Sequence, residues 1–228
     1  MWHTITSLGA AGVVLPLFAL QLLGLQAHHR AAANRWLLAF IVAVSVTLLS
    51  KLAFKGWGLG SAVLDFTGAS GHSLLASAVL PVFFRLRAPA SRPVLRHVGT
   101  AFGVLLALAV GVSRLKLDAH SISEVLAGWA LGFAVSAVAL SALGSTVRQS
   151  GWARLAPLAL LLVFIPTFGG IVPTEDVLDK VALRLSGQTH PFRRYHLKKL
   201  HAPVAVPPGW VSPVRGRPAS DPATSLSL

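Results

Sequence analysis

The sequence predicts an all-α membrane protein, a polytopic bundle of about six transmembrane helices. Of its 228 residues, 54% are hydrophobic and only 12% are charged, whereas an ordinary soluble domain is about 25% charged. The mean hydropathy of the chain is +0.68. The apolar residues are gathered into runs that basic loops separate, and a helix of roughly 20 such residues crosses a bilayer. These observations argue against a water-soluble globular protein.

Six apolar runs are the expected transmembrane helices. They cover residues 8–26, 36–50, 73–86, 98–112, 125–143 and 152–168. The leader before the first run contains no Lys or Arg. Because a cleaved signal peptide begins with basic residues, we expect the first run to stay as an anchored span. Trp36 opens the second run, and a tryptophan at such a position is typical of the membrane interface.

The charges of the loops predict how the spans are oriented. Six spans place both termini on one side of the membrane, together with loops 51–69 and 113–124. The loops on the other side are short and contain arginines but no acidic residue, a pattern typical of the cytoplasmic side. These arginines are Arg30, Arg35, Arg85, Arg87, Arg92, Arg96, Arg148 and Arg154. Loops 51–69 and 113–124 are therefore expected to face outward.

The last quarter of the chain differs in character, which predicts a domain boundary near residue 170. Residues 1–170 form the expected transmembrane domain and residues 171–228 a basic tail. Within the tail, residues 175–185 have the spacing of a short amphipathic helix. Residues 192–200 combine basic and aromatic side chains, which suits either an anionic lipid surface or solvent. Residues 202–228 are rich in Pro and Ser, a composition typical of disorder.

The net charge of the chain indicates which classes of partner it can bind. There are 20 Lys and Arg against 7 Asp and Glu, a formal net charge of +13. Alone, this balance would indicate a nucleic acid or an anionic surface. Because many of the basic residues lie in loops between apolar spans, we expect no nucleic-acid partner, and membrane lipids and an anion at the membrane surface instead. Without cysteine, the chain has no thiolate nucleophile and no cysteine metal ligand.

Side chains capable of chemistry gather in the outward loops. Between residues 36 and 143 the acidic residues are Asp65, Asp118 and Glu124, and all three lie there. The same loops and their flanks contain Lys51, Lys55, His72, Arg114, Lys116 and His120. Snorkelling at helix ends explains lysines in such places, but it does not explain two histidines. Because ionisable groups at membrane depth are costly, this cluster is a candidate site.

The string Ser70-Gly71-His72 opens the third run. Ser70 is placed to cap a helix, whose first-turn N–H groups then form an anion site. Gly71 lets a ligand approach the backbone closely, and His72 can give or take a proton near neutral pH. A Ser-Gly helix start is also common where it has no function.

A second string places Ser113 and Arg114 before His120 and Glu124. If a helix starts just after His120, the imidazole and the carboxylate lie one turn apart on the same face. The carboxylate can then accept the proton of one imidazole nitrogen and leave the other nitrogen free to attack, as covalent catalysis requires. Arg114 offers a planar fork for phosphate oxygens. Two other interpretations are helix capping by Glu124 and a metal cluster with Asp118, which lacks an H-E-x-x-H-type pattern.

Together these strings resemble the type 2 phosphatidic acid phosphatase (PAP2) superfamily, including its bacterial membrane lipid phosphatases. The family's PSGH motif is ASGH here, beginning at Ala69. Its SRxxxxxHxxxD motif begins at Ser113 and ends on Glu124 in place of aspartate. Its KxxxxxxRP motif is incomplete, because the best match begins at Lys51 and has Gly58 where the arginine belongs.

The resemblance, which covers residues 48–132, implies an activity and roles for the residues. Members of the family hydrolyse phosphoric monoesters or pyrophosphates without a metal or cofactor, so none is expected here. His120 would be the nucleophile that becomes a phosphohistidine, and Glu124 would orient it. His72 would protonate the leaving group and later activate water. The phosphoryl oxygens would be held by Lys51, Ser70, Gly71 and Arg114.

The resemblance also implies a substrate and a location. The substrate would be a lipid phosphate, such as phosphatidic acid or an isoprenyl pyrophosphate, and the sequence does not choose between them. The protein would be a multi-pass protein of a bacterial inner (cytoplasmic) membrane, with its active site on the periplasmic face. The oligomeric state is not indicated.

Two other functions remain open. Residues 68–71 also match the GxSG of rhomboid intramembrane proteases, in which Ser70 would be the nucleophile and His120 its base. Only two expected spans precede Ser70, whereas the rhomboid core has three. That interpretation gives no role to Lys51, His72, Arg114 or Glu124. The second alternative is a non-catalytic PAP2-like protein that binds a lipid phosphate, which the missing arginine and the Asp-to-Glu change favour.

Overall fold

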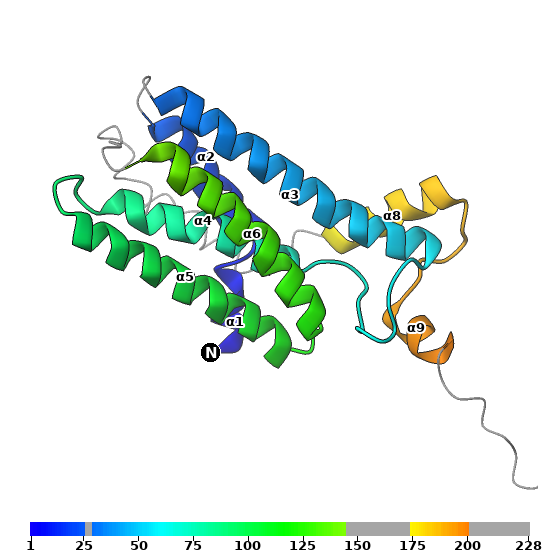
Figure 1. The fold of residues 1–228 in the computed structure, drawn as a ribbon. Coiled ribbons are helices and arrows are strands. Elements are labelled where there is room, and N and C mark those ends of the chain that lie inside the picture. The colour runs from blue at the N-terminus through cyan, green and yellow to red at the C-terminus, as the bar shows by residue number, and fades with distance from the viewer. Residues whose placement is uncertain (26–28, 145–173, 201–228) are drawn as a thin grey trace, which may run out of the picture.

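The described part of the chain consists of helices and their connecting loops (Figure 1). The computed structural model describes residues 1–25, 29–144 and 174–200. Within these ranges there is no β-strand, and Ser61 and Phe66 form an isolated antiparallel bridge. The helices are α1 (Trp2–Ser7), α2 (Ala11–Gly24), α3 (Arg30–Trp57), α4 (Gly71–Arg87), α5 (Pro93–Lys116), α6 (Ile122–Leu143), α8 (Thr174–Ser186) and α9 (Arg194–Leu200). The all-α prediction is confirmed.

In the part of the chain that the structure describes, four helical stretches are long and apolar enough to cross a membrane. They are Trp2–Gly24, which combines α1 and α2, and then Arg30–Trp57, Pro93–Lys116 and Ile122–Leu143. Large apolar side chains on these helices, such as Ile41, Phe102 and Leu126, are exposed, as expected for helices that face hydrocarbon. The chain is therefore a membrane protein.

These stretches correspond to four of the six expected spans. The first begins at Trp2, earlier than expected. The third expected span is α4, whose 17 residues make it shorter than the other four. The sixth, at residues 152–168, lies outside the described residues, as do the expected domain boundary near residue 170 and the tail 202–228. The count of six spans stays a prediction.

Helix α4 lies at the centre of the bundle. All its side chains from Ser73 to Phe83 are buried, because α5 and α6 pack along it and α2 also contacts it. Gly132 of α6 allows a close approach: a Cβ there would lie 2.0 Å from Ser77 Oγ and 2.4 Å from the Leu74 carbonyl oxygen. Small residues bring membrane helices together in this way. This packing fixes the first residues of α4 relative to α5 and α6.

An aromatic cluster joins α2 to α3. The Trp36 ring packs edge-on against Phe18, with ring centroids 4.9 Å apart, and Phe18 stacks on Phe40 at 4.0 Å. Trp36 is completely buried within this cluster, and its position at the depth of the membrane interface stays a prediction. The aromatic side chains of α2 and α3 give the indole an apolar environment inside the protein.

One end of the bundle collects the loops that contain the predicted site residues. Ser123 Oγ donates to the Leu64 carbonyl oxygen at 2.7 Å, and the Ser70 N–H donates to the Glu124 carbonyl oxygen at 2.9 Å. Helices α8 and α9 lie at the same end, beside the C-terminus of α3 (Figure 1). Loops 51–69 and 113–124 therefore meet, as their expected common side of the membrane requires.

The amphipathic helix expected at residues 175–185 is α8. Ala182 is completely buried, whereas Val177, Val181 and Leu185 are exposed. Three of the four residues of the expected apolar face therefore point away from the bundle, and the fourth, Leu178, is half-buried. The helix packs on α3 through the side that contains Ala182.

Candidate active site

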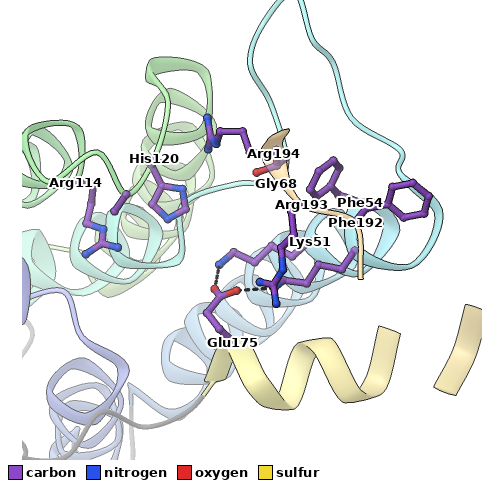
Figure 2. Close-up of a pocket in the computed structure, with 12 residues that line it drawn as sticks. Lys51, Phe54, Gly68, Arg114, His120, Glu175, Phe192, Arg193 and Arg194 are labelled. Carbon is purple, nitrogen blue, oxygen red and sulfur yellow. Dashed lines mark hydrogen bonds and ion pairs between the residues drawn. The ribbon is translucent and has the colours of Figure 1, made fainter. Parts of the chain in front are cut away.

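A cavity opens at the end of the bundle where these loops meet (Figure 2). Its walls come from the last turns of α3, the loop before α4, the end of α5, the loop before α6, the start of α8 and the residues that lead into α9. Its lining includes the ionisable residues Lys51, Lys55, Arg114, His120, Glu175, Arg193 and Arg194. Cations outnumber carboxylates in this set, which favours an anionic ligand.

The centre of the site is a hydrogen bond between His120 and Glu124. His120 Nδ1 lies 2.6 Å from Glu124 Oε2, and because a carboxylate only accepts, Nδ1 carries the proton. The local sequence sets this geometry: Ser121 caps α6, and its backbone N–H and side chain form a capping box with Glu124. The Glu124 carboxylate therefore takes part in the helix cap and also contacts the His120 imidazole.

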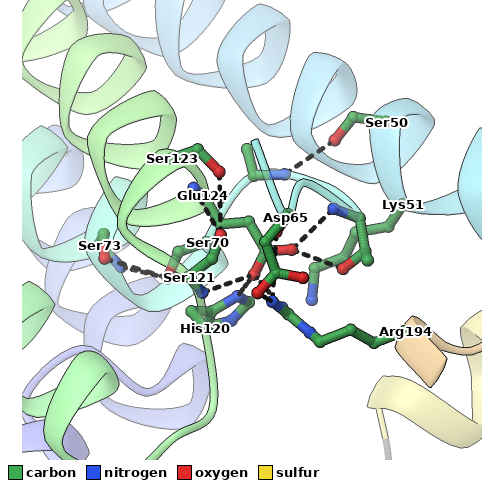
Figure 3. A network of polar contacts seen from close by, with 12 residues as sticks. Ser50, Lys51, Asp65, Ser70, Ser73, His120, Ser121, Ser123, Glu124 and Arg194 are labelled. Carbon is green, nitrogen blue, oxygen red and sulfur yellow. Dashed lines mark hydrogen bonds and ion pairs between the residues drawn. The ribbon is translucent and has the colours of Figure 1, made fainter. Parts of the chain in front are cut away.

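Glu124 is held from several sides (Figure 3). Its side chain is completely buried. Oε1 accepts from the Thr67 N–H at 2.7 Å and from Thr67 Oγ1 at 2.5 Å. Oε2 accepts from the Ser121 N–H at 3.2 Å and from Arg194 Nη2 at 2.7 Å, in addition to His120. A carboxylate with this many donors stays in one orientation and fixes the imidazole that it contacts.

His120 is set up as a neutral imidazole. Burial lowers its pKa below the ordinary value of 6.5, and the hydrogen bond and charge of Glu124 only partly offset this effect. With the proton on Nδ1, the lone pair of Nε2 is free. A neutral imidazole with an available lone pair is a competent nucleophile or base near neutral pH.

Arg114 and His72 lie on the α5 and α4 sides of the site. Arg114 Nη1 donates to Thr6 Oγ1 of α1 at 3.0 Å, and its buried Nε has no hydrogen-bond partner in the described part of the chain. This guanidinium therefore retains donors for a ligand. The His72 imidazole makes no hydrogen bond to any described residue, and it lies close enough to Arg114, His120 and Lys51 for their charges to act on it.

The residues at the start of α4 are placed differently from Lys51, Arg114 and His120, which line the cavity. Ser70 caps α4, as expected, by accepting from the Ser73 N–H at 3.5 Å, and Ser73 Oγ donates to Ser70 Oγ at 3.0 Å. Ser70 is completely buried, and it does not line the cavity. Gly71 does not line the cavity either, although the space beside its Cα is open. Of the predicted site residues, the cavity brings together Lys51, Arg114 and His120, with Glu124 directly behind His120. His72, like Ser70 and Gly71, does not line it.

Two lysines at the end of α3 are paired with carboxylates of α8. Glu175 lies 2.8 Å from both Lys51 Nζ and Lys55 Nζ, and Lys55 Nζ lies 2.5 Å from Asp179 Oδ1. Partial burial of Glu175 opposes its ionisation, but the charges and hydrogen bonds of the two lysines outweigh this effect and lower its pKa to about 2. A carboxylate of the chain itself thus occupies the place where Lys51 would meet an anionic ligand (Figure 2).

The C-terminal segment brings residues into the site that the sequence did not predict. Arg194 reaches Glu124 and also Asp65, whose Oδ2 accepts from Nη1 at 2.6 Å. Arg193 pairs with Asp179 at 2.6 Å. Arg194 therefore makes its ion pairs inside the site, whereas Arg193 is half exposed. The lipid-surface and solvent interpretations of residues 192–200 stay predictions. The feature of the sequence that could have indicated these ion pairs is the pair of adjacent arginines, in a chain with only 7 acidic residues.

The position of the missing motif arginine has a structural explanation. Gly58 ends α3 with a left-handed φ of 70°, which a side chain would strain. A Cβ there would lie 3.1 Å from Cε1 of Phe192. The C-terminal segment therefore packs where the family pattern has an arginine side chain.

The metal cluster that the sequence left open is not formed. Among the described residues there is no group of three or more His, Asp or Glu side chains that could hold a metal ion. Asp118 has a left-handed φ of 50° and is exposed.

The fold and this site define a class: an all-α membrane protein with a histidine–carboxylate pair in a cationic cavity. Comparisons with known proteins give the family. The model of the PAP2 superfamily matches residues 53–148, a region that contains His72, Arg114, His120 and Glu124. The "Uncharacterized 22.5 kDa protein in cps region" of Klebsiella pneumoniae is 37% identical over 204 residues, which cover 87% of this chain and 98% of that protein. No solved structure matches the chain significantly.

The chain belongs to the PAP2 superfamily, which confirms the resemblance of its motifs. Membership supports a phosphatase-type function, and it argues against the rhomboid interpretation of Ser70.

Proposed function

We propose that this protein is a membrane phosphatase that hydrolyses a lipid phosphate through a phosphohistidine on His120. The observation that carries the proposal is the 2.6 Å contact between His120 Nδ1 and the buried carboxylate of Glu124, beside a cavity that Lys51 and Arg114 line. Together these residues supply a nucleophile, the group that orients it, and cations for phosphoryl oxygens.

In the proposed first step, His120 Nε2 attacks phosphorus, and the bond from phosphorus to the leaving oxygen breaks. His72 gives its proton to that oxygen. In the second step His72 takes a proton from water, the water oxygen bonds to phosphorus, and the bond to Nε2 breaks. Arg114 and Lys51 hold the phosphoryl oxygens, where negative charge accumulates in both transition states.

A lipid phosphate suits the position of the site. The cavity lies at the ends of the apolar helices, where the head groups of a bilayer lie while acyl or isoprenyl chains remain between the helices and the lipid. The proposal therefore extends to phosphatidic acid and to isoprenyl pyrophosphates, which both present phosphate at that depth. The bacterial inner membrane is the proposed location.

The proposed function is tested by phosphate release from purified protein in detergent micelles. The panel contains phosphatidic acid, an isoprenyl pyrophosphate and glycerol 3-phosphate, each without added metal. We expect release from at least one lipid and much less from glycerol 3-phosphate. If the protein binds a lipid phosphate but releases nothing from any member of the panel, the non-catalytic alternative is correct.

We expect Glu175→Gln to tighten binding of the substrate phosphate. The carboxylate competes for Lys51, and because its pKa is about 2, it stays charged and keeps competing at all pH values above about 3. Exposed ion pairs are worth about 0.2–1 kcal/mol, so KM should fall by up to about fivefold while kcat stays similar. Steady-state kinetics with a short-chain phosphatidic acid measures both. Asp176→Asn, a change at an exposed neighbour, is the control, and an unchanged KM in Glu175→Gln would show that the carboxylate does not compete.

The proposed orientation predicts which loop is reached from outside the cell membrane. The chain has no cysteine, so single cysteines report on one position each. We expect Leu59→Cys, an exposed position at the site end, to react with an impermeant maleimide in intact spheroplasts. Pro89→Cys, at the opposite end, should react only after lysis. Labelling of Pro89→Cys in intact spheroplasts would reverse the orientation.

A further inference from the structure

Arg194 is connected to the histidine–carboxylate pair by a single oxygen atom. Oε2 of Glu124 lies 2.6 Å from His120 Nδ1 and 2.7 Å from Arg194 Nη2. The other arm of the guanidinium, Nη1, donates to Asp65 Oδ2 at 2.6 Å and to the Asp65 carbonyl oxygen at 3.2 Å. Figure 3 shows Arg194 entering from the opposite side of Glu124 to Ser121. The planar fork of arginine suits two such acceptors, which lysine would contact only as a point charge.

The segment that contains Arg194 is held in place by contacts other than this one. The Phe192 N–H donates to the Lys55 carbonyl oxygen at 2.9 Å, and the Phe192 ring packs at Gly58. Leu197 of α9 is buried, with 5% of its surface exposed. The position of Arg194 is therefore set by docking of the segment onto the end of α3, and not by its own ion pair alone.

The charge of Arg194 has a physical use at this place. Glu124 is completely buried, and a buried carboxylate is costly unless a cation compensates it. His120 must be neutral to attack, so it does not supply that compensation in the resting site. Arg194 pairs with Glu124 instead. It keeps the carboxylate turned so that Oε2 accepts from Nδ1.

We propose that Arg194 is a positioning residue of the active site, which holds Glu124 so that this carboxylate orients His120. The segment 192–200 is then part of the catalytic unit, although it lies outside residues 53–148, where the family model matches. The expected effect of Arg194 on turnover rests on the proposed function. The effect of Arg194 on His120 can be measured without turnover.

The test compares Arg194→Ala, Arg194→Lys and Arg184→Ala. Arg184 is an exposed arginine of α8, so its removal changes the net charge equally without touching the site. The first readout is the rate at which diethyl pyrocarbonate acylates His120, followed by mass spectrometry from pH 5 to 8. Besides Glu124, the charged groups that face His120 are Lys51 and Arg114, with His72 nearby, and all of them are unchanged in these variants.

We expect Arg194→Ala to move the midpoint of His120 acylation up by about one pH unit, because Glu124 without its Arg194 partner stabilises the imidazolium more strongly. Arg194→Lys should restore the midpoint, and Arg184→Ala should match the parent. In the phosphatase assay, Arg194→Ala should lower kcat by about 10- to 100-fold with KM changed less than about twofold, and Arg194→Lys should recover part of kcat. Thermal unfolding of each variant checks that the fold is intact.

A midpoint in Arg194→Ala equal to that of the parent, or an equal shift in Arg184→Ala, would overturn the assignment. A parent protein that releases no phosphate would instead overturn the proposed function, and the acylation midpoint would still decide the role of Arg194.

Discussion

Replacing His120 with alanine is expected to lower phosphate release by about 10⁴-fold or more. The imidazole is the proposed nucleophile, and removal of a catalytic nucleophile leaves only the binding and electrostatic contributions of the site. Binding should change little, because Lys51 and Arg114 are unaffected, so the loss should appear in kcat. Phosphate release in detergent with the best lipid of the panel measures the effect.

The matched control for this substitution is His97→Ala. His97 is exposed near the start of α5, at the opposite end of the bundle, and its Nδ1 contacts the Pro93 carbonyl oxygen at 2.9 Å. We expect this variant to keep the activity of the parent. A His120→Ala variant with more than a tenth of parental kcat would exclude His120 as the nucleophile.

Replacing Glu124 with glutamine is expected to lower kcat by about 10²–10⁴-fold, the range seen when the orienting carboxylate of a catalytic histidine is made neutral. An amide in place of the carboxylate can turn its NH₂ towards Nδ1, which moves the imidazole proton to Nε2 and blocks the attacking nitrogen. The charge that compensates Arg194 is also lost. The effect is measured as kcat, together with the rate of His120 acylation, which should fall in parallel.

The control for Glu124→Gln separates catalysis from helix capping. Ser121→Ala removes the side chain that accepts from the Glu124 N–H but leaves both carboxylate oxygens in place. Loss of such a cap costs about 1 kcal/mol of stability, so we expect a lower melting temperature and activity within a few-fold of the parent. If Ser121→Ala and Glu124→Gln lose the same activity, Glu124 acts as a capping residue and not on His120.

The local parts of the site were predictable from the sequence. Ser70 caps α4 where its motif placed it, and α6 starts just after His120 with Glu124 in its capping box, as the second motif allowed. The His120–Glu124 contact follows from a spacing of four residues at a helix start. Such features depend on neighbouring residues and on the geometry of one helix, so a single sequence contains the necessary information.

The parts that were missed depend on contacts between distant segments. Arg194 and Glu124 are 70 residues apart, and Lys51 and Glu175 are 124 apart, so no local pattern pairs them. The burial of Trp36 inside the bundle was also missed, because it depends on packing against Phe18 of another helix. The sequence of the basic segment 192–200 fitted a lipid-surface segment and a solvent-exposed tail equally well. The contact of Phe192 with the end of α3 determines where the arginines of this segment lie.

The measurement that tests the proposed mechanism most directly is trapping of the phosphoenzyme. The parent protein is mixed briefly with phosphatidic acid or an isoprenyl pyrophosphate labelled in the phosphate that is released, and the reaction is stopped in alkali. We expect label on the peptide that contains His120, stable in alkali, lost in acid and absent from His120→Ala. Label on a different residue, or full turnover by His120→Ala, would contradict the phosphohistidine mechanism.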